Sequence, residues 1–99
     1  MPYKIQISVR AVADIREAEN WYNEQLSGLG TRYKIAVKSQ INDLRDDALL
    51  YPVKYDDVHY RKIKGFPYLL HYRIKQNVVD IIAVIHTSRN PDIWHEKDI

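Results

Sequence analysis

Hydrophobic and polar residues alternate along residues 66–75, as expected for a β-strand with one buried face. One face carries Phe66, Tyr68, Leu70, Tyr72 and Ile74, and the other carries Leu69, His71, Arg73 and Lys75. The next run, 78–86, is apolar on both sides after Asp80, with Ile81, Ala83 and Ile85 on one side and Ile82 and Val84 on the other. A strand of that composition is expected to be covered on both faces.

Two amphipathic helices are predicted before these strands. Apolar residues recur at helical spacing at Ala11, Ile15, Ala18, Tyr22 and Leu26, and again at Tyr33, Val37, Ile41, Leu44 and Ala48. Ser8 is a suitable N-cap for the first helix, and Gly28 ends it. The short connection predicts that the helices are antiparallel neighbours. An alternating stretch from Tyr3 to Ser8 predicts a strand at the N-terminus.

The order of these elements predicts an α+β domain. The pattern β-α-α-β-β-β indicates an antiparallel sheet with the helical hairpin packed on one face, and the Asn90-Pro91 step predicts a short C-terminal turn or helix. A two-residue turn at 76–77 would place Arg73 opposite Asp80 and His71 opposite Ile82. Which later strand pairs with the N-terminal strand stays open.

Helices on one face would leave the other face of the sheet uncovered. An apolar centre of Leu69, Ile82 and Val84 is expected there, ringed by His71, Arg73, Asp80 and His86. Apolar patches with charged rims are typical of interaction sites, so we expect this face to bind a partner.

Composition excludes several classes of protein. The length of 99 residues fits one domain spanning 1–99. Without cysteine there is no disulfide or thiolate site, and the four histidines lack metal-ligand spacing, so no metal is expected. The glycines do not form a phosphate-binding loop, so no nucleotide cofactor is expected. The chain has no long apolar run and no signal peptide, which predicts a cytoplasmic protein that does not enter a membrane.

The charge distribution is uneven although the net charge is only +2. Residues 58–79 contain no acid, and their basic side chains are Arg61, Lys62, Lys64, Arg73 and Lys75. Basic residues interleaved with tyrosines fit an anionic partner such as a nucleic acid or an acidic peptide. The alternative is that these charges only protect exposed strand edges from pairing.

Two kinds of chemistry stay open at this point. Metal-free RNA cleavage needs cations and proton-transfer groups, and the candidates are Arg61, Lys62, Lys64, Arg73, Arg89, His71 and His86. His86 ends a strand, where it is either a proton carrier or a polar plug bonded to the neighbouring backbone. Arg89 and Trp94 follow the last strand and are suitable binding anchors, although Trp94 also fits a lid on the core.

Several short segments carry a family resemblance. They are Leu50-Tyr51-Pro52, Arg61-Lys62-Ile63, Gly65-Phe66-Pro67-Tyr68, Tyr72-Arg73-Ile74 and, as the most specific, the tail from Val84 to Trp94. Together they resemble the RelE/ParE toxin superfamily of bacterial toxin-antitoxin modules. The resemblance implies a small toxin without a cofactor, neutralised by a cognate antitoxin whose disordered segment folds over it. Whether a homodimer or a higher toxin-antitoxin assembly forms stays open.

The superfamily contains two activities, since ParE-like members inhibit DNA gyrase by binding and RelE-like members cleave mRNA on the ribosome. Tyr68 stands where RelE-like members carry an arginine, so the resemblance favours the ParE-like branch. It implies target- or antitoxin-binding roles for Arg61, Lys62, His71, Arg73, Ile82, Val84, Arg89 and Trp94. If the chain is instead a ribonuclease, the catalytic set is Arg61, Arg73, His86 and Arg89. A module that has lost toxicity and only binds antitoxin is the other alternative.

Overall fold

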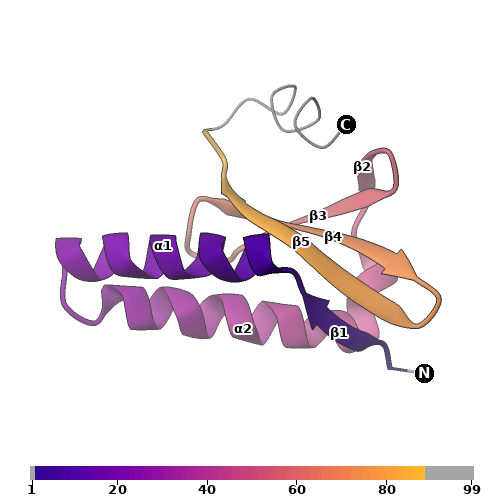
Figure 1. The fold of residues 1–99 in the computed structure, drawn as a ribbon, viewed down its shortest axis with the longest axis horizontal. Helices are drawn as coiled ribbons and strands as arrows, with labels where there is room; N and C mark the ends of the chain where they lie inside the picture. Colours follow the sequence, from indigo (N-terminus) through magenta and orange to yellow (C-terminus); the bar gives the residue numbers. More distant parts are fainter. Residues whose placement is uncertain (1, 89–99) are drawn as a thin grey trace.

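Residues 2–88 are described by the computed structural model, and they form a five-stranded sheet with two helices on one face (Figure 1). The elements are β1 (Lys4–Ile7), α1 (Val9–Gln25), α2 (Leu29–Asp47), a 3-10 helix η1 (Ala48–Leu50), β2 (Val53–Tyr55), β3 (Val58–Lys62), β4 (Tyr68–Lys75) and β5 (Val78–His86). This arrangement confirms the predicted α+β fold. The predicted C-terminal turn or helix lies outside the described residues.

The start of α1 and the turn that follows this helix contain the residues expected from the sequence. The Ser8 Oγ atom accepts the Ala11 N–H at 3.0 Å, which caps α1. After α1 the chain turns through Gly28, whose φ of 89° is left-handed, and α2 runs back beside α1 (Figure 1).

Neither helix is long and apolar enough to cross a membrane, within the part of the chain that the structure describes.

The two helices approach closely at Gly30. The Asn23 Oδ1 atom accepts the Gly30 N–H at 2.8 Å. A Cβ atom on Gly30 would lie 2.1 Å from the Glu19 carbonyl oxygen, so only glycine allows this spacing of α1 and α2.

The main core lies between the helices and the sheet. Its buried residues include Ala11, Ala18, Tyr33, Val37 and Leu44 from the helices, and Leu70, Tyr72, Val79, Ile81 and Val84 from the sheet. The buried Tyr72 hydroxyl donates to the Ala48 carbonyl at 2.6 Å, which ties the centre of the sheet to η1. The helical stripes and the alternation in β4 therefore predicted most of this core, although Leu26, the last residue of the first stripe, is 60% exposed.

A β-bulge in the β4–β5 hairpin changes which face the end of β5 presents. The turn at 76–77 and the pairing of Arg73 with Asp80 are as predicted. Beyond that pair, Tyr72 lies opposite Ile81 and His71 opposite Ala83, so Ile82 is the extra residue. The prediction that His71 lies opposite Ile82 is therefore wrong.

Because of the bulge, the residues at the end of β5 lie on the opposite faces from those predicted. Val84 lies on the helix face and is 2% exposed, so its placement on the open face is wrong. Ala83 and Ile85 instead lie on the second face, 3% and 2% exposed, with Tyr60, Leu69 and Ile82 packed around them. The apolar centre predicted to be bare is thus largely buried, because inserting one residue into a strand inverts every later position.

The sheet is mixed. Its order is β1-β5-β4-β3-β2, and β3, β4 and β5 are antiparallel as predicted. The prediction of a wholly antiparallel sheet is wrong for the first strand. β1 pairs in parallel with β5, from Lys4 opposite Val78 to Ile7 opposite Ile81. The three-residue edge strand β2, which the sequence did not predict, extends the sheet beyond β3.

Replacing Gly30 with alanine is expected to lower the free energy of unfolding by about 3 kcal/mol, because a backbone oxygen cannot move away from the new methyl group. Gly65→Ala serves as the control, since nothing lies within 4 Å of its Cβ position and only its φ of 87° is unfavourable. That variant should lose about 1 kcal/mol. Urea denaturation measures both, and equal losses would contradict the close approach.

Candidate functional site

Arg61 is held on the helix face of the sheet. It lies opposite Leu70 in the β3–β4 pair. Its Nη1 atom donates to the Gln40 carbonyl at 3.0 Å, and its Nη2 atom lies 3.4 Å from Asp43 Oδ2. The guanidinium also lies over the Tyr51 ring, 4.8 Å from the centroid. These contacts join β3 to α2 and indicate a stabilising role for Arg61.

Arg73 lies on the second face, opposite Asp80. Its Nε atom donates to Asp57 Oδ1 at 2.7 Å. This hydrogen bond, helped by the charge of Arg73, lowers the pKa of the Asp57 carboxyl. Arg73 therefore bridges β4 to the β2–β3 turn.

Other predicted site residues on the second face also have partners within the chain. The Lys62 Nζ atom is exposed and donates to the Phe66 carbonyl at 3.3 Å. His71 is fully buried against the Tyr60 ring at 4.4 Å, and its Nδ1 atom lies 3.5 Å from the Tyr55 hydroxyl. Ile82 is partly buried in the small apolar cluster described above.

Within residues 2–88, the structure does not bring all the predicted cationic residues together. Arg61 and Arg73 lie on opposite faces of the sheet. His86 lies on the helix face opposite Tyr68, at the end of β5. Arg89 and Trp94 lie outside the described residues.

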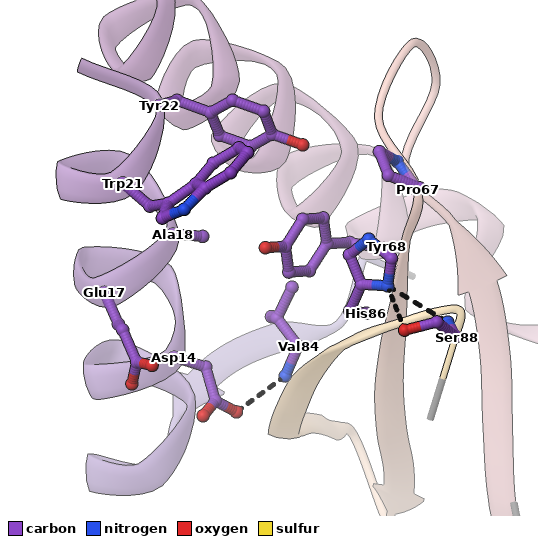
Figure 2. Close-up of a pocket in the computed structure, with 10 residues that line it drawn as sticks. All are labelled: Asp14, Glu17, Ala18, Trp21, Tyr22, Pro67, Tyr68, Val84, His86 and Ser88. Atoms are coloured by element: carbon purple, nitrogen blue, oxygen red, sulfur yellow. Dashed lines mark hydrogen bonds between the residues drawn. The ribbon is translucent and has the colours of Figure 1, made fainter. Parts of the chain in front are cut away.

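A pocket of about 540 Å³ lies between α1 and the ends of β4 and β5 (Figure 2). Helix α1 contributes Asp14, Glu17, Ala18, Trp21 and Tyr22. The sheet side contributes Pro67, Tyr68, Val84, His86 and Ser88. Of the predicted site residues that the structure describes, only Val84 and His86 line this pocket.

The pocket exists where β5 extends past the end of β1. Ile7, the last residue of β1, pairs with Ile81, so the next residues of β5 have a neighbouring strand only on the β4 side. The Ser8 Oγ atom donates to the Ile82 carbonyl at 3.1 Å, and Asp14 Oδ2 accepts the Val84 N–H at 3.0 Å (Figure 2). Side chains of α1 thus replace the missing strand and place a carboxylate in the pocket wall.

Aromatic rings form the rest of the wall. Trp21 and Tyr22 meet edge to face at 5.1 Å, and the Tyr68 and His86 rings do the same at 5.1 Å. The Ser88 N–H donates to His86 Nδ1 at 3.0 Å. The His86 side chain thus bonds to neighbouring backbone through an exposed hydrogen bond, and its role as polar plug or proton carrier stays a prediction. Across residues 2–88, no group of three His, Cys, Asp or Glu side chains is placed to hold a metal ion.

Sequence reasoning missed Asp14, Glu17 and Trp21 as site residues. The bond between Asp14 and Val84 joins positions 70 residues apart, so no local pattern reveals it. Trp21 did leave a trace, because a large aromatic residue lies outside the apolar stripe of α1 and 54% of it is exposed. A tryptophan on the polar face of a helix is typical of a binding surface.

Comparisons with known proteins give one family and several similar structures. The family model for the ParE toxin of type II toxin-antitoxin system, parDE, matches residues 5–91. A search of curated proteins finds no match. A structure of the chromosomal ParDE TA system from P. aeruginosa is similar, with 14% identity and a TM-score of 0.79 over 87% of this chain and 97% of that one.

Two E. coli structures are also similar. The isolated RelE toxin has 19% identity and a TM-score of 0.57 over 97% of this chain and 96% of that one. The chain matched in the intact RelBE toxin-antitoxin complex has 21% identity and a TM-score of 0.57 over 88% of this chain and 99% of that one. At these identities the likeness shows the fold alone.

Asp14→Ala is expected to lower the free energy of unfolding by about 2 kcal/mol, because the Val84 N–H loses its acceptor. Asp14→Asn keeps an acceptor oxygen and should lose less than about 1 kcal/mol. Glu17→Ala, one turn along the same helix, is the control and should change little. Urea denaturation measures all three, and equal losses for alanine and asparagine would show that the acceptor does not matter.

Arg73→Gln is expected to raise the pKa of Asp57 toward its ordinary value of 3.8. The Arg73–Asp57 pair stabilises the protein at pH values above 3.8. This stabilisation is lost as the pH falls through the lower pKa that Asp57 has in the folded state. The effect on stability is small because the Asp57 side chain is 65% exposed. A carboxyl NMR titration measures the shift. Lys75→Gln is the matched control and should raise the pKa of Asp57 less, since Lys75 contributes only charge at a distance.

Proposed function

We propose that this chain, which belongs to the ParE toxin family of type II toxin-antitoxin systems, inhibits DNA gyrase by binding to it and is neutralised by a cognate antitoxin. The family match over residues 5–91 confirms the superfamily resemblance predicted from the sequence. The similar structures include a ParDE system and a toxin-antitoxin complex, which supports an antitoxin as one partner.

The separation of Arg61 from Arg73 is the observation that favours inhibition by binding over RNA cleavage. Cleavage of a phosphodiester needs cations and proton-transfer groups that converge on one phosphate. Here the two arginines lie on opposite faces of the sheet, and each one contacts a carboxylate of the same chain. Moving either arginine to a shared phosphate would break contacts that join β3 to α2 or β4 to the β2–β3 turn. This geometry supports a toxin that acts through its surface.

Purified protein is expected to block supercoiling of relaxed plasmid by gyrase, and added antitoxin should restore it. Arg89→Ala and Trp94→Ala are expected to weaken the inhibition about tenfold while leaving the unfolding midpoint unchanged, since both residues are candidate binding anchors. Lys38→Ala, at an exposed position of α2, is the control and should inhibit like the parent protein.

Two outcomes would overturn this proposal. Unaffected supercoiling together with codon-specific cuts in translated mRNA, read by primer extension, would identify a ribosome-dependent ribonuclease. Unaffected supercoiling and translation, together with tight antitoxin binding, would identify a module that has lost toxicity.

A further inference from the structure

Strand β1 leaves one outer edge of the sheet open. Within residues 2–88 its only neighbouring strand is β5, as Figure 1 shows. The Lys4 and Ser8 N–H groups donate to carbonyls on the β5 side, at 2.8 and 2.9 Å. The backbone groups of successive residues in a strand point to opposite sides, so those of Ile5 and Ile7 point away from β5. The open edge of β1 therefore presents the N–H and C=O groups of two isoleucines.

The other outer edge of the sheet, strand β2, is protected against pairing with another chain. This strand has three residues, its register with β3 shifts between Val53 and Tyr55, and its central residue is the exposed Lys54. Short length, irregular pairing and lysine are common protections of edge strands. β1 is short as well, but its pairing with β5 is regular and isoleucines occupy its open edge. Of the two edges, β1 is the one suited to a further strand.

Apolar side chains are exposed where β1 leads into α1. The exposed fractions are 41% for Ile7, 88% for Val9 and 41% for Val12. Among the large hydrophobic residues that the structure describes, Val9 is the most exposed. Exposed apolar side chains beside an open strand edge are typical of a surface that another chain covers.

We propose that β1 pairs with β1 of a second copy of the chain, in antiparallel orientation about a twofold axis at Gln6. In this register Ile5 of each copy lies opposite Ile7 of the other, and the two residues exchange both backbone hydrogen bonds. The two Gln6 side chains face each other across the axis, and Lys4 lies opposite Ser8, so no like charges meet. The sequence of β1 is thus complementary to itself, and the two sheets become continuous.

Charges beyond the paired residues also favour a second copy as the partner. The Tyr3 N–H, on the open side of β1, donates to the Arg45 carbonyl at 2.7 Å, so the end of α2 lies beside the start of β1. The register places Val9 of the second copy opposite Tyr3, and Arg10 follows Val9 in the sequence. A basic residue of one copy thereby approaches the end of α2 in the other, where Asp46 is exposed. Symmetry forms this contact twice.

Sedimentation velocity and light scattering on the full chain measure its molar mass from about 5 to 500 μM, since self-association depends on concentration. We expect a reversible dimer with a Kd of about 10–100 μM, because one short strand pair is at the small end of specific interfaces.

Charge variants at the twofold axis identify the register. Gln6→Lys and Gln6→Glu are each expected to weaken dimerisation about fivefold, because like charges then lie directly opposite each other. An equimolar mixture of the two variants should regain the parent affinity as a heterodimer. Gln6 is exposed, so the unfolding midpoint should not change. Gln25→Lys, at the exposed last residue of α1, is the control and should dimerise like the parent chain.

Amide hydrogen exchange followed by NMR locates the contact. Exchange at Ile5 and Ile7 should slow as the protein concentration rises, because their N–H groups gain acceptors. The amides of β2, on the other edge, are the internal control and should not change.

Four results would overturn the proposal. They are a chain that stays monomeric at the highest concentration, a dimer that Gln6→Lys does not weaken, a mixture that does not regain association, and protection at β2 in place of β1. A monomer whose Ile5 and Ile7 amides become protected only on addition of antitoxin would assign this edge to the antitoxin instead. Dimerisation is measured without gyrase, so its failure leaves the supercoiling result standing.

Discussion

The structure depends on the hydrogen bonds that strand β5 makes along its edge beyond the end of β1. β1 ends opposite Ile81, while β5 continues to His86, and a hydrophobic strand cannot leave its backbone groups without partners. Ser8 and Asp14 satisfy the Ile82 carbonyl and the Val84 N–H. Because Ser8 caps α1 and Asp14 lies in its second turn, the same contacts fix that helix against the sheet. The position of α1 then determines the width of the pocket.

The fold could be predicted from the sequence wherever local periodicity decides it. The helical stripes, the Ser8 cap and the alternation of β4 all describe contacts within a few residues of one another, and each is found as expected. The faces of β5 were predicted wrongly beyond Ile82. The bulge at that residue depends on pairing with β4 and leaves no local pattern in the sequence. For the same reason Val84, placed correctly as apolar, was placed on the wrong side.

The candidate site was harder to predict than the fold, because residue type does not reveal whether a charge is already paired. The basic run of 58–79 suggested a surface for an anionic partner. Arg61 and Arg73 instead bind carboxylates from the acidic stretch just before that run, at Asp43 and Asp57. The asymmetry in charge along the sequence is thus partly cancelled in space. The pocket was missed for a different reason, since one side of it comes from α1 and the other from Tyr68 and His86, about 45 to 70 residues later in the sequence.

The pairing of the first strand with the last has a consequence for synthesis of the protein. Contacts from Ser8 to Ile82 and from Asp14 to Val84 span 74 and 70 residues, so they cannot form until the segment up to Val84 has left the ribosome. A nascent chain that stops before Val78 offers β1 no neighbour in the sheet. The native sheet therefore forms only after β5 has been synthesised, and products that terminate before it cannot reach the native structure.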